Sequence, residues 1–483
     1  MLPAVLLGVL AALLLSPGLL VGPSLDPSVF VQVASELKHG ATLYADAWDH
    51  KPPGIYLLYA AGQLLLPFLD EWLVAWLLSM AATTGTALLV ARILRRTDVA
   101  PAVTWVAAAG AVVAMAQYLT ALGGGLTEPI ALLPLTAALA LAVGTASIGR
   151  LLLIGALLSV TLLIAIPLLP GAVAVLAYVA WRPGLRAVPL VVAGGALPAL
   201  ATAGWLAWTG ALEAAVDAVV GYSAAYRLTN DAAGWMLSAP VVTWTVLALL
   251  FLIGPALLGI TAGWRVGGQR RALALAAVGW IGLSLVLFAY QGRFFAHYAI
   301  PLAVPLAILA GFGMERLTVV LGSVRAGAPR LAAALPVLLV VLISVAAAVA
   351  GGRFEWLPVA RDHERSLRVA EAIRAQTDEG DTIWVWGNEP QLYLAAERRS
   401  ATHYDYLYPL VTPGYTTAEM VADTAADLAA EPPPVIVDAG SREPGVVGFQ
   451  QLLIPRPLTS DGRDLDILDP LRDFVRGHYT EGQ

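Results

Sequence analysis

The chain has 483 residues, of which 59% are hydrophobic and 13% are charged, and its mean hydropathy is +0.75. An ordinary globular protein carries roughly 25% charged residues, so this composition excludes a typical soluble enzyme. The chain has no cysteine, which excludes disulfide frameworks, thiolate metal sites and cysteine nucleophiles. The formal net charge of −6 gives no general attraction to nucleic acid, so we expect no nucleic-acid partner.

Charge is unevenly distributed along the chain. Residues 1–352 hold 12 acidic and 16 basic residues, whereas residues 353–483 hold 22 acidic residues and 12 arginines. We therefore predict a transmembrane domain at 1–352, which includes a first outer loop at 23–70, and a water-compatible acidic domain at 353–483.

Apolar segments recur throughout residues 1–352. A transmembrane helix needs about 20 mostly apolar residues. The sequence predicts eleven spans, near residues 3–22, 71–93, 100–118, 129–147, 150–166, 167–181, 187–208, 239–261, 272–290, 299–319 and 330–350. The fold class is therefore a polytopic α-helical membrane protein with about 11 transmembrane helices.

The arginines predict the orientation of these spans, because short cytoplasmic loops are enriched in Lys and Arg. Arginines near residues 92–96, 182–186 and 265–271 fall in alternate loops, which we predict to be cytoplasmic. The other loops hold most of the acidic residues of the membrane domain and should face outward. The apolar run at 54–68 then forms a short interfacial or re-entrant helix, since an extra crossing would invert every later loop. We predict a multi-pass protein of the cell (plasma) membrane.

The acidic C-terminal part has the pattern of a small α/β domain on the outer face. Residues 361–376 have helical apolar spacing, and residues 382–386 and 435–437 are short strands bounded by Gly, Pro and Asp. An aromatic and polar run that includes Trp384 and Trp386 contributes either to acceptor binding or to the core of this domain. Packing in the core explains the tryptophans more simply.

The stretch from Leu25 to Ile55, within the first outer loop, is dense in polar groups. It contains four carboxylates, two histidines and both lysines of the chain. A solvated loop whose charges have no function is the simplest interpretation. Against it, Asp26 lies where the first span ends, and the Lys51-Pro52-Pro53-Gly54 turn returns the chain to the membrane with the lysine ammonium group at headgroup depth.

The pattern G-x-x-L-Y-x-D-x-x-D-H-K-P-P-G at residues 40–54, preceded by Asp26, resembles the first outer loop of the GT-C superfamily of polyprenyl-phosphate-sugar-dependent glycosyltransferases. The nearest branch looks like the protein mannosyltransferase and aminoarabinose transferase group, which includes bacterial transferases of the RgtA/B/C/D type. Two further segments, at 123–129 (GGGLTEP) and 292–298 (GRFFAHY), are also similar to that group.

This resemblance implies an inverting GT-C enzyme that moves a hexose or pentose from a polyprenyl-phosphate donor to a glycan, lipid or protein acceptor of the cell envelope, on the outer face. The acceptor hydroxyl must lose its proton as it attacks the anomeric carbon, and a carboxylate can act as the general base. The match to the family's first-loop aspartate gives this role to Asp26. Related enzymes are mostly metal-independent, and the D-x-x-D spacing is too common to indicate a metal, so we predict no cofactor and no metal. A divalent cation held by Asp46, Asp49 and His50 is the less favoured alternative.

Cations stabilise a departing phosphate, and Lys51 and Arg293 are among the few basic side chains on the predicted outer side. We predict that both bind the donor phosphate, with His297 and Tyr298 as further hydrogen-bonding groups. Anchoring to lipid headgroups is the alternative for Lys51 and Arg293, and an ordinary interfacial side chain with its polar tip in water is the alternative for His297. For substrate binding we predict Tyr44, Asp46, Asp49, His50 and Glu128. Tyr44 could instead be an interface anchor, and Glu128 could simply be an acid near a helix N-terminus.

A multi-pass transporter or lipid flippase is the competing class of protein. Transporters commonly place ionisable residues near the bilayer midplane. Here the acidic residues collect in the predicted outer loops, and the spans hold almost none. The sequence therefore favours the transferase, but it leaves the sugar, the prenyl carrier and the acceptor open.

Overall fold

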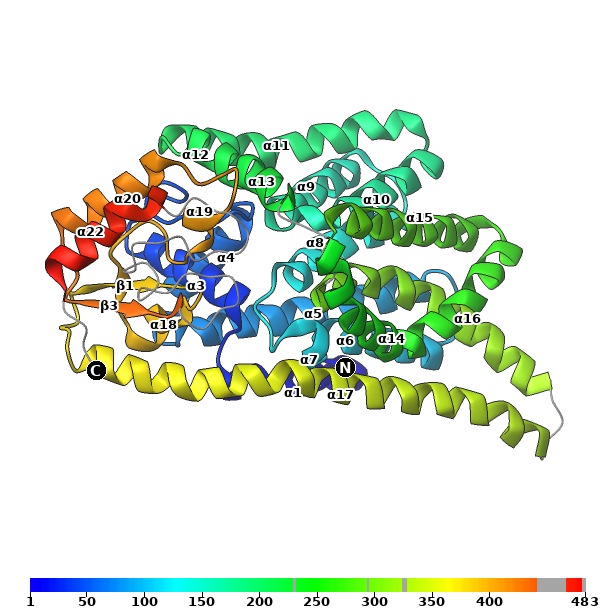
Figure 1. The fold of residues 1–483 in the computed structure, drawn as a ribbon. Helices are drawn as coiled ribbons and strands as arrows, with labels where there is room; N and C mark the ends of the chain where they lie inside the picture. The colour runs from blue at the N-terminus through cyan, green and yellow to red at the C-terminus, as the bar shows by residue number, and fades with distance from the viewer. Residues whose placement is uncertain (229–231, 293–294, 324–327, 441–465, 480–483) are drawn as a thin grey trace. The chain divides into compact units, whose positions relative to one another are not determined.

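The computed structural model describes residues 1–228, 232–292, 295–323, 328–440 and 466–479. The chain divides into two compact units, each assembled from three segments. The first unit comprises Met1–Val21, Ala75–Gly204 and Asp231–Val359, and the second comprises Gly22–Val74, Trp205–Asn230 and Ala360–Gln483. Figure 1 shows that helices dominate the chain and that the strands belong to its C-terminal part.

The first unit is built from apolar helices. Its main helices are α1 (Leu2–Leu15), α2 (Pro17–Val21), α5 (Glu71–Arg95), α6 (Pro101–Ala116), α7 (Tyr118–Ala121), α8 (Thr127–Ala142), α9 (Ile148–Ile164), α10 (Leu169–Trp181), α11 (Val188–Trp208), α14 (Ala232–Val266), α15 (Gly268–Gln291), α16 (Ala303–Ser323) and α17 (Ala328–Arg374), with 3₁₀ turns at Ile166–Leu168, Leu185–Ala187 and Ala296–Leu302. Six stretches in the described residues are long and apolar enough to cross a membrane, and shorter apolar helices accompany them. Each of the eleven predicted spans coincides with a helix, so the polytopic helical fold is confirmed.

Small residues allow close packing of helices in this unit. On α14, a Cβ added to Gly259 would lie 1.8 Å from the carbonyl oxygen of Leu309 on α16. On α16, a Cβ added to Gly313 would lie 1.8 Å from the carbonyl oxygen of Pro255 on α14. The two backbones are therefore in direct contact, as is typical of membrane helices that meet at small residues.

Helix α17 is longer than the sequence predicts. A span at 330–350 and a separate helix at 361–376 are expected, but one 47-residue helix runs from Ala328 to Arg374. Glycine within a helix costs only about 1 kcal/mol relative to alanine, so the pair Gly351-Gly352 does not end it. Gly351 also packs closely on two other helices of the first unit, because a Cβ there would lie 3.0 Å from Leu119 of α7 and 3.1 Å from Trp244 of α14.

The second unit contains a small parallel sheet. The strands β1 (Thr382–Trp386), β2 (Arg399–Ser400) and β3 (Val435–Asp438) are arranged in the order β2-β1-β3, with Ile383 opposite both Ser400 and Val435. Its helices are α3 (Leu25–Lys38), α4 (Gly54–Leu65), α12 (Leu212–Val216), α13 (Ser223–Leu228), α18 (Gln391–Ala396), α19 (Tyr408–Val411), α20 (Ala418–Ala430) and α22 (Asp469–His478), with a π-helical segment at Asp217–Tyr222 and a 3₁₀ turn at Asp466–Leu468.

Both faces of the central strand β1 are buried. Ile383 and Val385 pack with Ala370 and Ile373 at the end of α17 and with Tyr393 of α18. Trp384 and Trp386 are each only 1% exposed, and their ring centroids lie 5.4 Å apart. These tryptophans are therefore core residues, as the packing interpretation predicts.

The apolar run after the lysine turn forms the short helix α4, as the sequence predicts. Its 12 residues give a length of about 18 Å at 1.5 Å per residue. The hydrocarbon layer is about 30 Å thick, so α4 is too short for a full crossing. Its interfacial or re-entrant position stays a prediction.

Candidate functional site

Asp26 lies in the first turn of α3, which begins at Leu25. An acidic side chain at this position interacts favourably with the positive end of the helix dipole. Asp26 is half-buried, and its carboxylate has no hydrogen bond or ion pair within the described ranges of the chain. The geometry therefore leaves this carboxylate available to a ligand.

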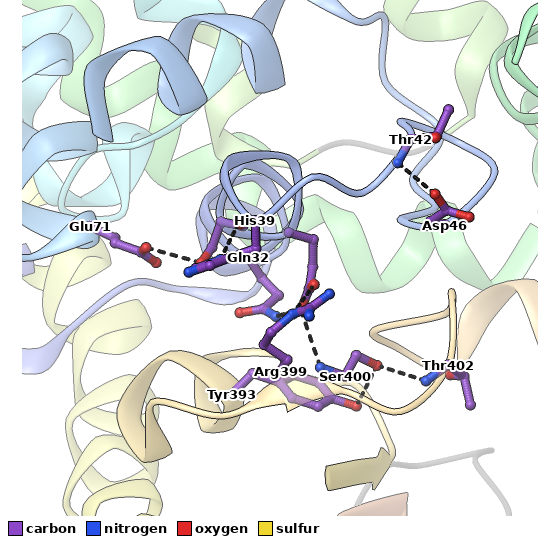
Figure 2. Close-up of polar contacts among 11 residues, drawn as sticks. Gln32, His39, Thr42, Asp46, Glu71, Tyr393, Arg399, Ser400 and Thr402 are labelled. Atoms are coloured by element: carbon purple, nitrogen blue, oxygen red, sulfur yellow. Dashed lines mark hydrogen bonds and ion pairs between the residues drawn. The ribbon is translucent and has the colours of Figure 1, made fainter. Parts of the chain in front are cut away.

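The loop between α3 and α4 is a tight, internally bonded turn. The Tyr44 amide donates to the Ala47 carbonyl at 2.8 Å, and the Thr42 amide donates to Asp46 Oδ2 at 2.7 Å, as Figure 2 shows for the latter pair. Tyr44 has a φ of +69°, is 2% exposed, and donates from its hydroxyl to the Lys51 carbonyl oxygen at 2.8 Å. Tyr44 thus fixes the backbone at Lys51, whose side chain is half-buried.

Asp49 is the centre of a buried network. Its side chain is 1% exposed, and its Oδ1 accepts hydrogen bonds from Tyr406 Oη at 2.5 Å and from His50 Nδ1 at 2.9 Å. Its Oδ2 accepts from the hydroxyl of Tyr56 on α4. Burial alone would raise the pKa of Asp49, but the His50 imidazole and these hydrogen bonds outweigh it and hold the pKa below its usual value. Asp49 is therefore a buried anion.

A second buried carboxylate, Glu36 on α3, bonds to strand β2. Its Oε2 accepts from Arg399 Nε at 2.9 Å, and its Oε1 accepts from the Ser400 amide at 3.2 Å. Gln32, one turn earlier on α3, donates to Oε1 at 3.0 Å. Figure 2 shows Arg399 and Ser400 beneath Gln32 of α3, with Tyr393 next to Ser400. The first outer loop and the C-terminal strands are therefore tied together within the second unit.

Aromatic rings from three segments of the second unit gather around the first loop. We call this set the aromatic cluster; its members are Trp48, His50, Tyr222, Tyr226, Tyr404, Tyr406, Tyr408 and Tyr415. Tyr222 lies centrally, with its ring centroid 5.0 Å from those of Trp48, His50 and Tyr415. Tyr222 ends the π-helical segment, a feature that is rare and often found at functional sites.

Glu128 belongs to the first unit, in the first turn of α8. It is 3% exposed and accepts a hydrogen bond of 3.3 Å from Thr127. The three preceding glycines have φ values of +87°, +112° and +80°, a region that favours glycine. A Cβ on Gly123 would lie 2.5 Å from the Cα of Gly18, so this loop is held against α2.

His297 and Tyr298 also belong to the first unit, on the 3₁₀ turn before α16. His297 is 8% exposed, and its ring centroid lies 4.8 Å from that of Tyr298 in an edge-to-face contact. Tyr298 stacks on Phe288 of α15 at 5.8 Å. Arg293 lies outside the described residues.

Six of the predicted site residues lie in the second unit and three others lie in the first. The second unit holds Asp26, Tyr44, Asp46, Asp49, His50 and Lys51, whereas the first unit holds Glu128, His297 and Tyr298. Within the described residues, no three acidic or histidine side chains converge in a way that could hold a metal ion. The functional role of each side chain stays a prediction.

Sequence reasoning missed the C-terminal partners of the first loop, above all Tyr406 and Arg399. The residues 403–408 (HYDYLY) are unusually rich in tyrosine, and this is the signal that could have identified them. Nothing local shows that Tyr406 approaches Asp49, because the contact joins distant parts of the chain.

Comparison with known proteins yields structural matches only. No protein-family model and no curated protein sequence matches the chain. The structure of ArnT from Cupriavidus metallidurans bound to undecaprenyl phosphate is similar, with a TM-score of 0.55, 18% identity, and coverage of 82% of this chain and 85% of that chain. The apo structure of the same ArnT gives a TM-score of 0.56, 17% identity, and coverage of 88% and 94%.

The chain has the GT-C fold. ArnT is an aminoarabinose transferase of the GT-C superfamily. The resemblance to this superfamily, which the sequence pattern of the first loop indicates, therefore agrees with the three-dimensional fold. At this level of identity the match establishes the GT-C fold, and the activity of the chain must be argued from its own residues.

Proposed function

We propose that this protein is an integral membrane glycosyltransferase that moves one sugar from a polyprenyl-phosphate donor to an acceptor on the outer face of the cell membrane. The observation that carries the proposal is the combination of the GT-C fold with the polar first loop. ArnT has been determined with undecaprenyl phosphate bound, which supports a polyprenyl phosphate as the leaving group here. The ordered Asp26 and Lys51 provide the chemistry that such a donor requires.

In the proposed reaction, Asp26 accepts the proton of the acceptor hydroxyl while the hydroxyl oxygen forms a bond to the anomeric carbon. The bond from this carbon to the phosphate oxygen breaks, and polyprenyl phosphate leaves with the electron pair. A general base typically contributes 10²- to 10⁴-fold to the rate. Lys51 stabilises the negative charge on the departing phosphate, with Arg293, His297 and Tyr298 as further donor-binding groups. A single displacement of this kind inverts the configuration of the sugar.

The remaining predicted residues are assigned to substrate binding. Asp46 and His50 are accessible on the first loop, whereas Tyr44 and Asp49 are buried and shape the loop from within. Glu128 is buried at the start of α8 in the first unit. The acceptor is a glycan, lipid or protein of the cell envelope.

Identification of the bound lipid tests the proposal directly. Mass spectrometry of lipid that co-purifies with the full-length protein should detect a polyprenyl phosphate or its glycosylated form. The purified protein should also release polyprenyl phosphate from that glycosylated lipid when acceptor is present. A flippase, the alternative function, would leave the lipid-linked sugar intact.

The outer-face orientation has its own test. Reporter fusions after Arg96, Arg186 and Arg271 should report a cytoplasmic location, and a fusion at the C-terminal end should report the outside. A cytoplasmic signal from the C-terminal fusion would place the second unit, with Asp26 and Lys51, on the cytoplasmic side of the membrane. It would contradict the proposed outer-face site.

A further inference from the structure

The environment of His50 differs from that of an ordinary loop histidine. Its side chain is 23% exposed, while its carboxylate partner Asp49 is 1% exposed. An ionised carboxylate can only accept hydrogen bonds, so Nδ1 of His50 carries a proton, and in the neutral form of the ring it carries the only one. Nε2 is then a hydrogen-bond acceptor, and in the described part of the chain it has no hydrogen-bonding partner. Asp49 is itself held by Tyr56 and Tyr406, so the imidazole is fixed in one tautomer and orientation.

Two half-exposed tyrosine rings belong to the same part of the aromatic cluster. The ring centroid of Tyr226 lies 6.3 Å from that of His50, and the centroid of Tyr408 lies 6.3 Å from that of Tyr226. Tyr222 stacks on Tyr226 with ring centroids 5.6 Å apart, Tyr406 meets Tyr408 edge-to-face at 5.9 Å, and these two partners are buried at 0% and 3% exposure. The buried rings therefore pack against the more accessible rings of Tyr226 and Tyr408. This arrangement offers flat apolar ring faces beside one acceptor atom of fixed orientation, His50 Nε2.

The charge of the second unit restricts the ligand. Its three segments contain 29 acidic and 14 basic residues, a net charge of −15. An acidic group borders the aromatic cluster, because Tyr415 donates to Oδ2 of the exposed Asp217 at 2.6 Å. Lys51, next to His50, is assigned to the donor phosphate, and the remaining charge of the unit disfavours a second anionic ligand. A neutral sugar fits the same surface, because its C–H face can stack on a ring and its hydroxyls can donate to an imidazole nitrogen.

We propose that His50, Tyr226 and Tyr408 form a binding subsite for a neutral sugar residue of the acceptor, with a sugar hydroxyl donating a hydrogen bond to His50 Nε2. This inference rests on the proposed glycosyltransferase function and names the class of acceptor, a neutral glycan. His50 is then a sugar-binding residue, and Asp49, Tyr56 and Tyr406 are positioning residues that set the orientation of its ring. Asp26 keeps the role of general base.

The tautomer of His50 can be observed without any substrate. The full-length protein, labelled with ¹⁵N at its six histidines and reconstituted in lipid nanodiscs, gives long-range ¹H–¹⁵N spectra that distinguish the two tautomers. The signal of His50 is the one that disappears in His50→Gln. We expect the Nδ1–H form in the wild type and its loss in Asp49→Asn. An Nε2–H form in the wild type would overturn the proposal.

Neutral and anionic sugars then test the subsite. The probes are the methyl glycosides of mannose, glucose, galactose and arabinose, compared with glucuronate and galacturonate. At least one neutral glycoside should shift the His50 signal, and neither anion should do so. Tyr408→Ala should weaken the binding of that glycoside by about fivefold or more, whereas Tyr408→Phe, which retains the ring, should preserve it. Failure of all four neutral glycosides to shift the signal, or an equal shift by the anions, would overturn the proposal.

His403 is a matched control within the same unit. Its side chain is also 23% exposed and its Nδ1 lies 3.3 Å from Asp427, but that carboxylate is 50% exposed. The His403 signal should not respond to the neutral glycosides, and an equal response would show non-specific binding and overturn the subsite. The lipid-linked sugar is measured in a separate sample. Absence of the lipid-linked sugar from the wild-type sample would count against the glycosyltransferase function. A His50 signal that no neutral glycoside shifts would count against the subsite.

Discussion

Tyr406 donates a hydrogen bond of 2.5 Å to the buried carboxylate of Asp49, although 357 residues separate the two in the chain. Asp49 immediately precedes the histidine and lysine of the first loop, and Tyr406 belongs to the C-terminal part. The C-terminal part therefore contributes directly to the structure of the proposed active-site loop, in addition to any role in the choice of acceptor. The following predictions test this arrangement and the chemistry assigned to it.

Lys51→Ala should weaken the binding of undecaprenyl phosphate by about 10- to 100-fold, because a hydrogen bond to a charged group is worth about 1.5–3 kcal/mol. Lys51→Arg should lose less affinity, since it retains a positive charge. The measurement is the Kd of each variant for undecaprenyl phosphate in detergent or nanodiscs. If both variants bind it as the wild type does, Lys51 is an anchor to lipid headgroups and has no part in donor binding.

Arg399→Ala should lower the stability of the second unit by about 1–2 kcal/mol. Glu36 is only 6% exposed and loses its cation, but the arginine is itself 53% exposed, so solvent screening reduces the effect. Lys38→Ala is the matched control. Lys38 and Glu71 form an ion pair of 2.6 Å, but both side chains are more than a fifth exposed, so its loss should change the stability by less than about 1 kcal/mol. Apparent Tm values of the two variants provide the comparison. An equal or smaller decrease for Arg399→Ala would show that the Arg399–Glu36 ion pair does not hold α3 to β2.

The stability of the second unit should depend on pH through Asp405. Burial raises the pKa of this carboxyl group well above its usual value, the negative charge of Glu36 raises it further, and Asp49 adds to the effect, against smaller opposing contributions from Ser400 and Arg399. The folded protein therefore binds more protons here than the unfolded chain does. The free energy of unfolding should consequently fall as the pH rises above the unfolded pKa of about 3.9.

Asp405→Asn cannot ionise, so this variant should lose that part of the pH dependence and have a higher Tm than the wild type at pH 8. Asp423→Asn, on the exposed surface of α20, is the control and should follow the wild-type curve. The measurement is Tm between pH 5 and pH 8 for all three proteins. Parallel curves for Asp405→Asn and the wild type would show that Asp405 is ionised in the folded state.

The sequence predicts most of the fold because its strongest signals are local. The apolar spans, the short helix after Lys51 and the strands around Trp384 and Val435 each depend on residues within one segment, and each occurs in the structure. The first loop could also be singled out as a candidate site from its polar residues alone. The continuity of α17 could not be predicted, because Gly351 and Gly352 suggest a break where tertiary packing maintains the helix.

The contacts that support the site could not be predicted from the sequence, for a different reason. Glu36 and Arg399 are 363 residues apart, and nothing in either segment indicates its partner. Burial is equally invisible in the sequence: Tyr44 and Asp49 look like exposed loop residues, yet they are 2% and 1% exposed. A single sequence gives the chemical groups of the loop, and the folded chain shows which of them face inward.

The central claim is that Asp26 is the base in a sugar transfer from a polyprenyl phosphate. Its most direct test is the rate at which polyprenyl phosphate is released from the co-purifying glycosylated lipid in the presence of acceptor, for the wild type, Asp26→Asn and Asp70→Asn. Asp70 is an exposed acid that caps α5 through a 3.0 Å bond from the Leu73 amide, and asparagine caps a helix equally well. We expect Asp26→Asn to lose about 10²- to 10⁴-fold in rate while its affinity for the lipid and the activity of Asp70→Asn remain unchanged. Release by Asp26→Asn within about tenfold of the wild-type rate would contradict the account.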